Sequence, residues 1–393
     1  MRIYGTRTFF NSAVAGEHGM KIVFITNMCS HFVRPLFEIL ARRYEVKFYF
    51  TGGHEAYWYK RNELKSGDFK GTYLGGLLLS GNFKVTPGLF ALPWLQCGAV
   101  VKTIDDRFAL PVAFCAAKLF GKPFILWTGL WAHPQTPLHR RTFGLTKFIY
   151  RHADAIITYG EHVRRYLTDI GIDERKIFCA PHATDNTVYD RPVGEAEKIQ
   201  LKQRWKITVD SKVILFVGRL EEGKGLEYLA EAMGRLKDKA AFVLVGTGSK
   251  ETGLRDLCTQ KGVCAVFVGH VDNEELYFYY AMADIFVLPS VTTSDFKEPW
   301  GMVINEAMNQ GCAVVTTDAV GAAAGGLVEE GKTGFIVAEK NSARLAEALE
   351  HLLKDETMRR RMGQAGRAKI AAWTPQQQAE GFARAFAYVE NDH

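Results

Sequence analysis

The chain has 393 residues, of which 47% are hydrophobic, and its formal net charge is +6. This length predicts two domains of about 180 residues, each able to bury a core of its own. The modest positive charge favours an anionic ligand or membrane surface, and the absence of any nucleic-acid-binding motif speaks against a nucleic-acid-binding protein.

Neither a membrane-spanning helix nor a disulfide framework is expected. Apolar runs stay below the roughly 18 residues that cross a bilayer, and the first nineteen residues lack the continuous apolar region of a signal peptide. The seven cysteines are scattered and odd in number, which favours buried, reduced thiols. We therefore expect a cytoplasmic protein that is soluble or associates peripherally with a membrane.

The first half of the chain alternates between strands and helices, as in a parallel α/β sheet. Residues 1–19 fit no regular element and are interpreted as an N-terminal extension, either disordered or a start-site artefact. Strands are expected at residues 21–26, 45–50, 98–104, 123–128, 155–159 and 176–180, and helices at 32–43, 107–120, 138–152 and 160–169. In the loop at 27–31, either Ser30 or His31 reaches toward a ligand, or Ser30 caps the next helix.

Two stretches of this half carry charged side chains that invite a functional interpretation. Residues 52–95 are weakly periodic and rich in aromatic and basic residues, so they form either a ligand-facing excursion or a loop packed on its own domain. Asp105 and Asp106 are adjacent, but aspartates in front of a helix are better explained as helix caps than as metal ligands.

The helix expected at 138–152 is basic. It carries Arg140, Arg141, Lys147 and Arg151 with several aromatic residues and no acidic residue. Such a helix can lie on an anionic membrane, and it can equally be a solvated face backed by core aromatics. Both interpretations stay open, with a slight preference for membrane contact.

Residues 212–225 form the first of two segments that suggest an activated-sugar site. The apolar run 212–217 predicts a buried parallel strand, which is followed by Gly218 and Arg219 and, five positions after the arginine, by Lys224. Ligands of open α/β sheets bind beyond the carboxyl ends of strands, and cationic side chains near a helix N-terminus favour phosphate. We therefore expect this loop to bind a diphosphate.

The second segment contains two glutamates eight positions apart. A strand at 284–290 is followed by Glu298 and then by a helix, which places Glu306 roughly 12 Å from Glu298 along the helix axis. At this separation the two carboxylates cannot share a proton or a metal, so one could bind sugar hydroxyls and the other a ribose. The amides of Trp300 and Gly301 would face a diphosphate between them.

The order of these motifs resembles the retaining family-four glycosyltransferases of the GT-B fold. The likeness rests on GRL followed by KG, on a strand that ends in PS, and on EPWGMVINEAMNQG, whose Glu298 and Glu306 match the E-x7-E signature. It extends through residues 266–286 and 320–337 and so covers nearly the whole second half. The resemblance implies an α/β protein with two Rossmann-like parallel-sheet domains facing across a cleft.

Four segments are expected on this basis. They are an N-terminal extension at 1–19, an acceptor-side Rossmann-like domain at 20–190, a nucleotide-sugar-binding Rossmann-like domain at 191–372, and a C-terminal helix at 373–393 that returns to the first domain. The charged stretch 191–204 links the two domains.

The resemblance also implies a set of site residues. His133 lies in the loop after a strand of the first domain, where the family has a histidine near the transferred sugar; an ordinary loop histidine is the alternative. The expected donor-binding residues are Gly218, Arg219, Lys224, His270, Val271, Glu298, Trp300, Gly301, Met302, Val303 and Glu306. The expected catalytic residues are Glu298, His133, Arg219 and Lys224. Neither a metal nor a cofactor is expected, because the nucleotide sugar is a substrate.

The sequence thus predicts a retaining, metal-independent glycosyltransferase of the hexosyltransferase type (EC 2.4). It would move a sugar from a UDP- or GDP-sugar to a hydroxyl of a glycan or lipid-linked acceptor, in cell-envelope polysaccharide or glycolipid synthesis, with peripheral contact to an anionic membrane. Glu298 would hold the sugar, Glu306 the ribose, and the two cations the departing diphosphate. The alternatives are a GT-B nucleotide-sugar epimerase, a phosphorylase and a noncatalytic nucleotide-sugar-binding subunit.

Overall fold

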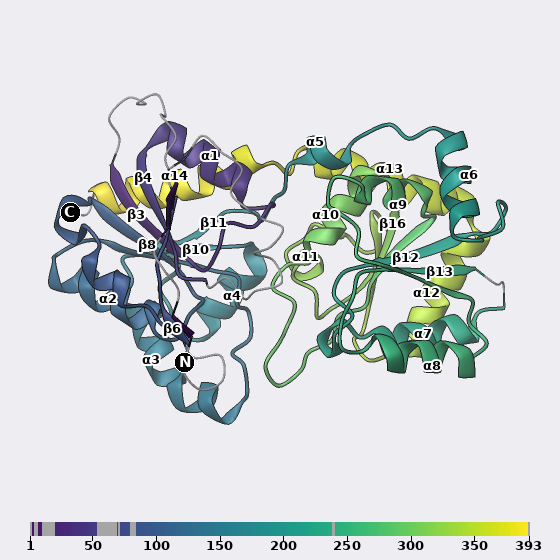
Figure 1. Ribbon diagram of the computed structural model, residues 1–393, viewed down its shortest axis with the longest axis horizontal. Helices are drawn as coiled ribbons and strands as arrows, with labels where there is room; N and C mark the ends of the chain where they lie inside the picture. Colours follow the sequence, from purple (N-terminus) through teal and green to yellow (C-terminus); the bar gives the residue numbers. More distant parts are fainter. Residues whose placement is uncertain are drawn as a thin grey trace. The chain divides into compact units, whose positions relative to one another are not determined.

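The computed structural model describes residues 2–3, 7–9, 20–52, 69, 71–78, 84–237 and 240–391. The chain divides into two compact units (Figure 1). Unit 1 comprises Met1–His133, Pro137–Ala183 and Pro375–His393, and unit 2 comprises Pro134–Thr136 and Thr184–Thr374. The division therefore falls after Ala183, whereas the sequence analysis places it after residue 190.

Among the described residues, unit 1 contains an eight-stranded sheet with the order β11-β10-β9-β8-β3-β4-β5-β2. All neighbouring strands run parallel except β2, which pairs antiparallel with β5 at the edge. The strands are β2 (Arg7–Phe9), β3 (Lys21–Thr26), β4 (Glu45–Phe50), β5 (Gly71–Tyr73), β8 (Ala99–Thr103), β9 (Phe124–Thr128), β10 (Ala155–Thr158) and β11 (Ile177–Cys179). The central strands are mostly apolar and almost fully buried, which reflects burial on both faces of the sheet.

The N-terminal segment departs from the prediction that residues 1–19 contain no regular element. β1 (Arg2–Ile3) pairs with β6 (Leu77–Leu78), which in turn pairs with β7 (Lys84–Val85), and β2 extends the main sheet. Strands of two or three residues are too short to produce a recognisable alternation of apolar and polar residues. β1 and β2 also pair with strands that are about seventy residues away in the sequence, so no local pattern predicts them.

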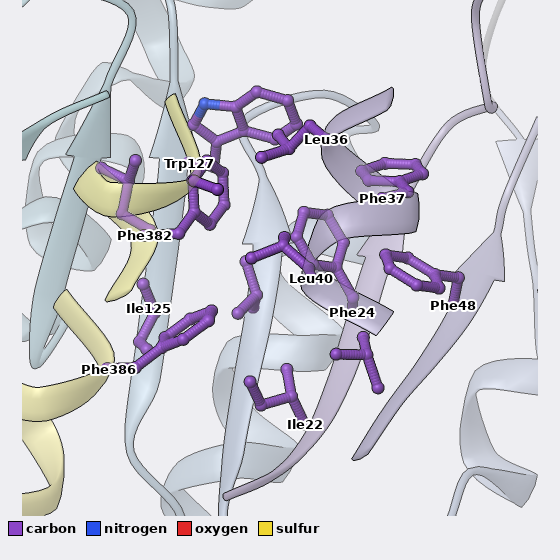
Figure 2. Close-up of a cluster of buried hydrophobic side chains, with 14 of the residues drawn as sticks. Ile22, Phe24, Leu36, Phe37, Leu40, Phe48, Ile125, Trp127, Phe382 and Phe386 are labelled. Carbon is purple, nitrogen blue, oxygen red and sulfur yellow. The ribbon is translucent and has the colours of Figure 1, made fainter. Parts of the chain in front are cut away.

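Helices cover both faces of the unit 1 sheet. The helices α1 (Arg34–Arg43) and α14 (Pro375–Asn391) pack on one face, and α2 (Ala109–Leu119), α3 (Pro137–His152) and α4 (Glu161–Asp169) pack on the other. Figure 2 shows how Phe382 and Phe386 of α14 enter the core beside Ile125 and Trp127 of β9. The ring centres of Phe382 and Trp127 are 5.2 Å apart. The last helix of the chain thus completes the core of unit 1.

Residues 52–95 divide between core and surface where they are described. Phe69, Tyr73 and Trp94 are buried, and the Trp94 indole donates to the Leu89 carbonyl at 3.1 Å, so these residues pack on their own unit. Phe90, in the 3-10 helix Pro87–Ala91, is 71% exposed. A second 3-10 helix covers Trp94–Gln96. Most of the predicted aromatic and basic excursion lies outside the described residues, namely Tyr57, Trp58, Tyr59, Lys60, Arg61, Lys65, Lys70 and Phe83.

Within its described residues, unit 2 contains a six-stranded parallel sheet with the order β14-β13-β12-β15-β16-β17. The strands are β12 (Val213–Val217), β13 (Ala241–Val245), β14 (Ala265–Gly269), β15 (Ile285–Leu288), β16 (Ala313–Thr317) and β17 (Gly334–Val337). The order reverses direction between β12 and β15, which makes the carboxyl ends of these two strands the place where a ligand is expected.

The helices of unit 2 also lie on both sides of its sheet, as Figure 1 shows. They are α5 (Asn186–Tyr189), α6 (Glu195–Arg204), α7 (Leu226–Arg235), α8 (Glu251–Gln260), α9 (Leu276–Met282), α10 (Met302–Asn309), α11 (Gly321–Ala324), α12 (Ser342–Lys354) and α13 (Glu356–Ala371). Short 3-10 helices at Glu174–Lys176, in unit 1, and Glu222–Lys224, in unit 2, complete the description. No helix in the described ranges combines the length and the apolar character needed to cross a bilayer.

Candidate functional site

The loop after β12 is shaped by three glycines. The buried strand ends at Val217 and is followed by Gly218. The chain then turns through Gly223 in the 3-10 helix Glu222–Lys224 into Gly225, the N-cap of α7, whose φ is +61° in the left-handed region. A Cβ atom at Gly225 would lie 2.2 Å from the Pro289 carbonyl oxygen, and one at Gly223 would lie 2.5 Å from the Phe296 ring. The missing side chains let this loop lie directly against the end of β15.

This close approach brings Lys224 and Glu298 together. The Lys224 ammonium donates to Glu298 Oε2, and the Ser290 hydroxyl donates to the same oxygen at 2.9 Å. The side chains of Lys224 and Glu298 are only 14% and 10% exposed, so their ion pair is shielded from solvent. Lys224 Nζ also lies 5.3 Å from the centre of the Phe296 ring. Two of the predicted catalytic residues therefore form one cluster at the carboxyl ends of neighbouring strands.

Arg219 lies beside this cluster and is exposed. Together with Lys224 it lines a pocket of about 630 Å³, which is further bordered by segment 291–296 and by Lys340. Lys340 adopts a positive φ of +61° in the turn after β17. The neighbouring Glu339 accepts hydrogen bonds from the amide and hydroxyl of Thr292, which ties the β17 turn to the loop after β15. Three cations thus line one concave surface, beside the acidic residues Glu221, Glu222, Glu227 and Asp295.

Glu298 precedes the helix instead of beginning it. It forms a bridge with Val320, and α10 begins only after Gly301, whose φ of +94° makes it the N-cap. The predicted separation of the two glutamates by helical rise therefore does not apply. The sequence analysis was wrong on this point because Pro299 indicates a first helical turn, whereas the left-handed glycine sets the start of the helix.

Glu306 is almost fully buried on α10, at 3% exposure. Its Oε2 accepts a hydrogen bond of 2.6 Å from the Tyr280 hydroxyl. Burial, and after it the Glu306 carboxylate, raises the pKa of Tyr280 well above its usual value, and the same two causes raise the pKa of Tyr189. Both tyrosines therefore stay protonated and able to donate. The structure places the second glutamate in a buried phenol cluster, separate from the Lys224 ion pair.

The side chain of Trp300 is buried. Its indole donates to Asn305 Oδ1 at 2.8 Å and stacks on Trp373 with ring centres 5.7 Å apart, so the side chain belongs to the core. The amides of Met302 and Val303 lie in the first turn of α10, where helical amides have no intrahelical acceptor and attract anions.

The loops after β12, β13 and β14 lie close together. A Cβ atom at Gly246 would lie 1.9 Å from the Gly218 carbonyl oxygen, and one at Gly248 would lie 2.2 Å from that of Leu220. The glycines of the 246–248 segment therefore permit close packing of these loops. In the loop after β14, His270 Nε2 lies 3.2 Å from Asp272 Oδ1 in an exposed position, and Val271 is half-buried.

Two further predicted features lie in unit 1. His133, in the loop after β9, donates from Nε2 to the His139 carbonyl at 2.8 Å, and its ring lies 4.3 Å from that of Phe143. Asp106 accepts from the amides of Phe108 and Ala109 at the start of α2, which confirms its predicted capping role. The other side-chain candidate for a cap, Ser30, does not act through its hydroxyl, because Val33 is the N-cap of α1.

Asp105 has a partner that the sequence did not reveal. The ammonium of Lys102, a residue with no exposed surface, pairs with Asp105 and donates to the Thr103 carbonyl at 2.8 Å, while Asp105 Oδ2 accepts from the Asn27 amide. Asp105 thereby holds the ends of β3 and β8. In the portion of the chain that the structure describes, no group of three His, Cys, Asp or Glu side chains is arranged to hold a metal ion.

Known proteins resemble this chain in sequence. Residues 197–369 match the family model described as glycosyl transferases group 1. Unit 2 is a group 1 glycosyl transferase domain. The matched range lies within unit 2 and includes the loop after β12, the Lys224–Glu298 pair and α10, so the group 1 domain contains the whole cluster described above.

The relatives of the group 1 domain are glycosyltransferases by name. An uncharacterized glycosyltransferase of Methanocaldococcus jannaschii is 37% identical over 208 residues, which is 51% of this chain and 51% of that protein. A GDP-mannose-dependent alpha-(1-6)-phosphatidylinositol monomannoside mannosyltransferase of Mycobacterium tuberculosis is 32% identical over 184 residues, 45% of this chain and 47% of the relative. The chain thus spans about half the length of these curated relatives.

Both units resemble solved structures in fold. HepE of Anabaena in complex with UDP has a TM-score of 0.76 at 18% identity, and the match covers 94% of this chain and 100% of that one. Two parallel-sheet units with helices on both faces constitute the GT-B fold, which confirms the predicted fold class.

The residues that sequence reasoning missed are the partners of the two glutamates. Ser290 stands at the end of the PS strand motif, and its place directly after a buried strand could have drawn attention to it. Tyr280 lies in an aromatic helix with no such signal, because its link to Glu306 depends on how α9 and α10 pack.

Proposed function

We propose that the chain is a retaining, metal-independent glycosyltransferase. It transfers a sugar from a UDP- or GDP-sugar to a hydroxyl of a glycan or lipid-linked acceptor. The observation that carries the proposal is the cluster of Lys224, Glu298 and Ser290 at the carboxyl ends of β12 and β15, with Arg219 beside it. The cationic side chains of this cluster fit the diphosphate of a substrate, and its carboxylate fits the hydroxyls of a sugar ring.

The chemistry requires stabilisation of a departing nucleoside diphosphate. Arg219 and Lys224 supply two positive charges where negative charge grows on the leaving group, and the first amides of α10 add hydrogen bonds without a metal ion. The low exposure of Lys224 strengthens its interaction with a phosphate.

Glu298 orients the sugar. Its carboxylate is fixed by Lys224 and Ser290, so it accepts hydrogen bonds from sugar hydroxyls in one orientation and aligns the anomeric carbon with the acceptor. Glu306 binds the ribose of the donor, and the loop at His270 and Val271 faces the base.

Retention follows from attack on the same face that the diphosphate leaves, with a donor phosphate oxygen accepting the acceptor proton. A double displacement needs two carboxylates about 5 Å apart that flank the bond. Glu306 is engaged by Tyr280 inside the core, which disfavours such a role.

The names of similar proteins support a test of both nucleotides. HepE was crystallised with UDP and with UDP-glucose, and the mycobacterial relative is described as GDP-mannose-dependent. We therefore include the uridine and the guanosine diphosphates as ligands in the experiment that follows.

Calorimetry of UDP and GDP binding, with and without a chelator, tests the donor site. One nucleotide should bind, the chelator should not alter its affinity, and Arg219→Ala should weaken it at least about tenfold, because a charge-assisted phosphate contact is lost. Arg344→Ala is the matched control, since Arg344 is an exposed arginine of the same unit that pairs with Glu347 on α12.

The proposal is contradicted if neither UDP nor GDP binds.

The rival functions give different products when the protein is incubated with a nucleotide sugar and an acceptor. An epimerase would release a free sugar in the absence of an acceptor. A noncatalytic subunit would bind the donor but would not consume it, even after long incubation.

A further inference from the structure

The pocket of about 630 Å³ in unit 2 lies at the carboxyl edge of the sheet, on the side that α7 covers. Its walls are the loop after β12, the first turn of α7, segment 291–296 and Lys340. Helix α7 packs against α8 and α12, whereas α10 packs against α9 and α13 on the other side of the sheet, as Figure 1 shows. Glu306 is on α10 and His270 is in the loop before α9, and neither lines the pocket. The pocket is therefore distinct from the region proposed for the nucleoside.

The pocket opens beside the proposed diphosphate site. Arg219 and Lys224 line it, and Lys224 holds Glu298, the residue proposed to orient the transferred sugar. In the proposed function the nucleoside lies toward α9 and α10 and the diphosphate lies at the two cations. The sugar is the other end of the donor, so it extends toward the pocket. Small-molecule sites occupy roughly 300–1,000 Å³, so this pocket has room for a sugar ring and its substituents.

Segment 291–296 is a rigid wall of the pocket because it is closed by its own hydrogen bonds. The Thr293 amide donates to the Phe296 carbonyl at 2.8 Å, and the Phe296 amide donates to the Thr293 hydroxyl at 3.1 Å. The same hydroxyl donates to Asp295 Oδ1 at 2.8 Å. The turn after β17, which carries Lys340, is bonded to this segment as well. Asp295 and Lys340 therefore project from a well-defined backbone.

Most charged side chains around the pocket already have a role. Glu221 accepts hydrogen bonds from the amide and the hydroxyl of Ser249, which ties it to the loop after β13. Glu222 lies 3.9 Å from Lys250, which offsets its charge. The two cations of the β12 loop serve the diphosphate in the proposed function. These groups are therefore not the ones that would distinguish one sugar from another.

Glu227, Asp295 and Lys340 are the charged residues of the lining that remain, and all three are exposed. Two carboxylates and one ammonium give this part of the pocket a negative balance. Burial raises the pKa of the neighbouring Tyr228, and nearby carboxylates, with Glu227 the first among them, raise it further. Tyr228 therefore stays protonated and can donate to a sugar hydroxyl. Carboxylates accept hydrogen bonds from hydroxyls but repel an acidic sugar.

We propose that this pocket receives the sugar of the donor, and that Glu227, Asp295 and Lys340 determine which sugar is accepted. The inference rests on the proposed function, because it needs a nucleotide sugar whose diphosphate lies at Arg219 and Lys224. A sugar with neutral groups beyond the anomeric carbon fits the pocket, and a uronic acid is disfavoured. The three residues act on specificity and take no part in bond cleavage.

Calorimetry with matched nucleotide sugars tests the two carboxylates. The ligands are UDP, UDP-glucose and UDP-glucuronic acid, or GDP, GDP-mannose and GDP-mannuronic acid if the protein binds GDP. The parent should bind the neutral sugar about fivefold or more tightly than the acidic one, and Glu227→Gln/Asp295→Asn should lower this ratio roughly fivefold. A change in affinity for the nucleotide alone acts on both sugars and cancels in the ratio. Glu347→Gln/Glu356→Gln removes the same charge from α12 and α13 and should leave the ratio unchanged.

Lys340→Gln tests the same balance with the opposite sign. Removal of the ammonium should widen the preference for the neutral sugar, by roughly threefold. Nucleotide binding by each variant verifies that unit 2 is folded.

Three results would overturn the inference while the proposed function stands. The parent could bind the uronic acid as tightly as the neutral sugar, it could bind the nucleotide and neither sugar, or the two variants could fail to move the ratio in opposite directions. Failure of both UDP and GDP to bind would instead contradict the proposed function, and this inference with it.

Discussion

Glu298 is the residue on which the proposed chemistry depends most directly. Glu298→Gln keeps the size of the side chain but removes the negative charge that Lys224 and Ser290 orient. Transfer should fall by about 100-fold or more, because the sugar loses its alignment with the acceptor, while nucleotide affinity changes little. Initial rates with a fixed acceptor and calorimetry of the product nucleotide separate the two quantities.

Glu356→Gln, at the start of α13, controls for a generic loss of one carboxylate. A Glu298→Gln protein that transfers sugar at the parent rate would remove Glu298 from the mechanism. A variant that loses nucleotide binding and transfer together would show that Glu298 serves the diphosphate site through Lys224.

Tyr280 is expected to act on the donor through Glu306. In Tyr280→Phe the buried carboxylate loses its 2.6 Å hydrogen bond, which should cost about 1–3 kcal/mol of stability and weaken nucleotide binding. Tyr279→Phe is the matched control, because it removes a buried neighbouring hydroxyl that is bonded to the Trp205 indole at 3.2 Å. The control should lose stability without losing affinity. Equal nucleotide affinity in both variants would mean that Glu306 is purely structural.

At the scale of the elements, the loops after the strands of unit 2 pack so closely that certain positions have no room for a side chain. Gly246 has a φ of +133°, and its Cβ position lies 1.9 Å from a backbone oxygen of the Arg219 loop. Gly246→Ala should therefore destabilise the protein by about 2–4 kcal/mol and displace Arg219. The control is Gly253→Ala in α8, where a Cβ atom meets nothing within 4 Å and should stabilise by about 0.5–1 kcal/mol. Urea unfolding of both variants gives the comparison, and a tolerated Gly246→Ala would contradict the close packing.

The elements that sequence reasoning placed correctly share one property. The strands at residues 21–26 and 45–50 have the predicted bounds, because each is a continuous apolar or amphipathic segment. The predicted loop positions of Lys224 and Glu298 follow from the same reasoning. Their contact could not be derived from spacing, since it requires β12 and β15 to be neighbours in the sheet. Two other features also depend on three-dimensional geometry that spacing does not report. They are the start of α10 after the left-handed Gly301 and the pairing of Lys102 with Asp105.

At the scale of the whole molecule, α14 connects the end of the chain to the core of unit 1. Gln378 Nε2 of this helix lies 3.1 Å from Nδ1 of His182, which stacks on Tyr159 at 4.1 Å. Burial lowers the pKa of His182 to about 3. The residue is therefore neutral in the folded protein at pH values where it would be protonated in the unfolded chain, whose ordinary histidine pKa is about 6.5.

This difference predicts an acid-dependent loss of stability. Below about pH 6.5 the unfolded state binds one proton more than the folded state, so the free energy of unfolding falls as pH drops toward 3, by up to about 1.4 kcal/mol per pH unit. In His182→Gln this part of the dependence should disappear. Urea unfolding at a series of pH values between these limits measures the slope, and an unchanged slope in the variant would assign the acid sensitivity to other groups.

The position of α14 in the sequence also determines the order of folding during synthesis. Translation produces the strands of unit 1 first, but the packing of Phe24 and Trp127 is complete only when Phe382 and Phe386 follow, after the sequence of unit 2 has been synthesised. The sequence of unit 2 is complete before α14 is synthesised, and domains generally fold as units. Until then this face of the unit 1 sheet carries α1 without α14, so the segment that appears first on the ribosome is among the last to complete its core.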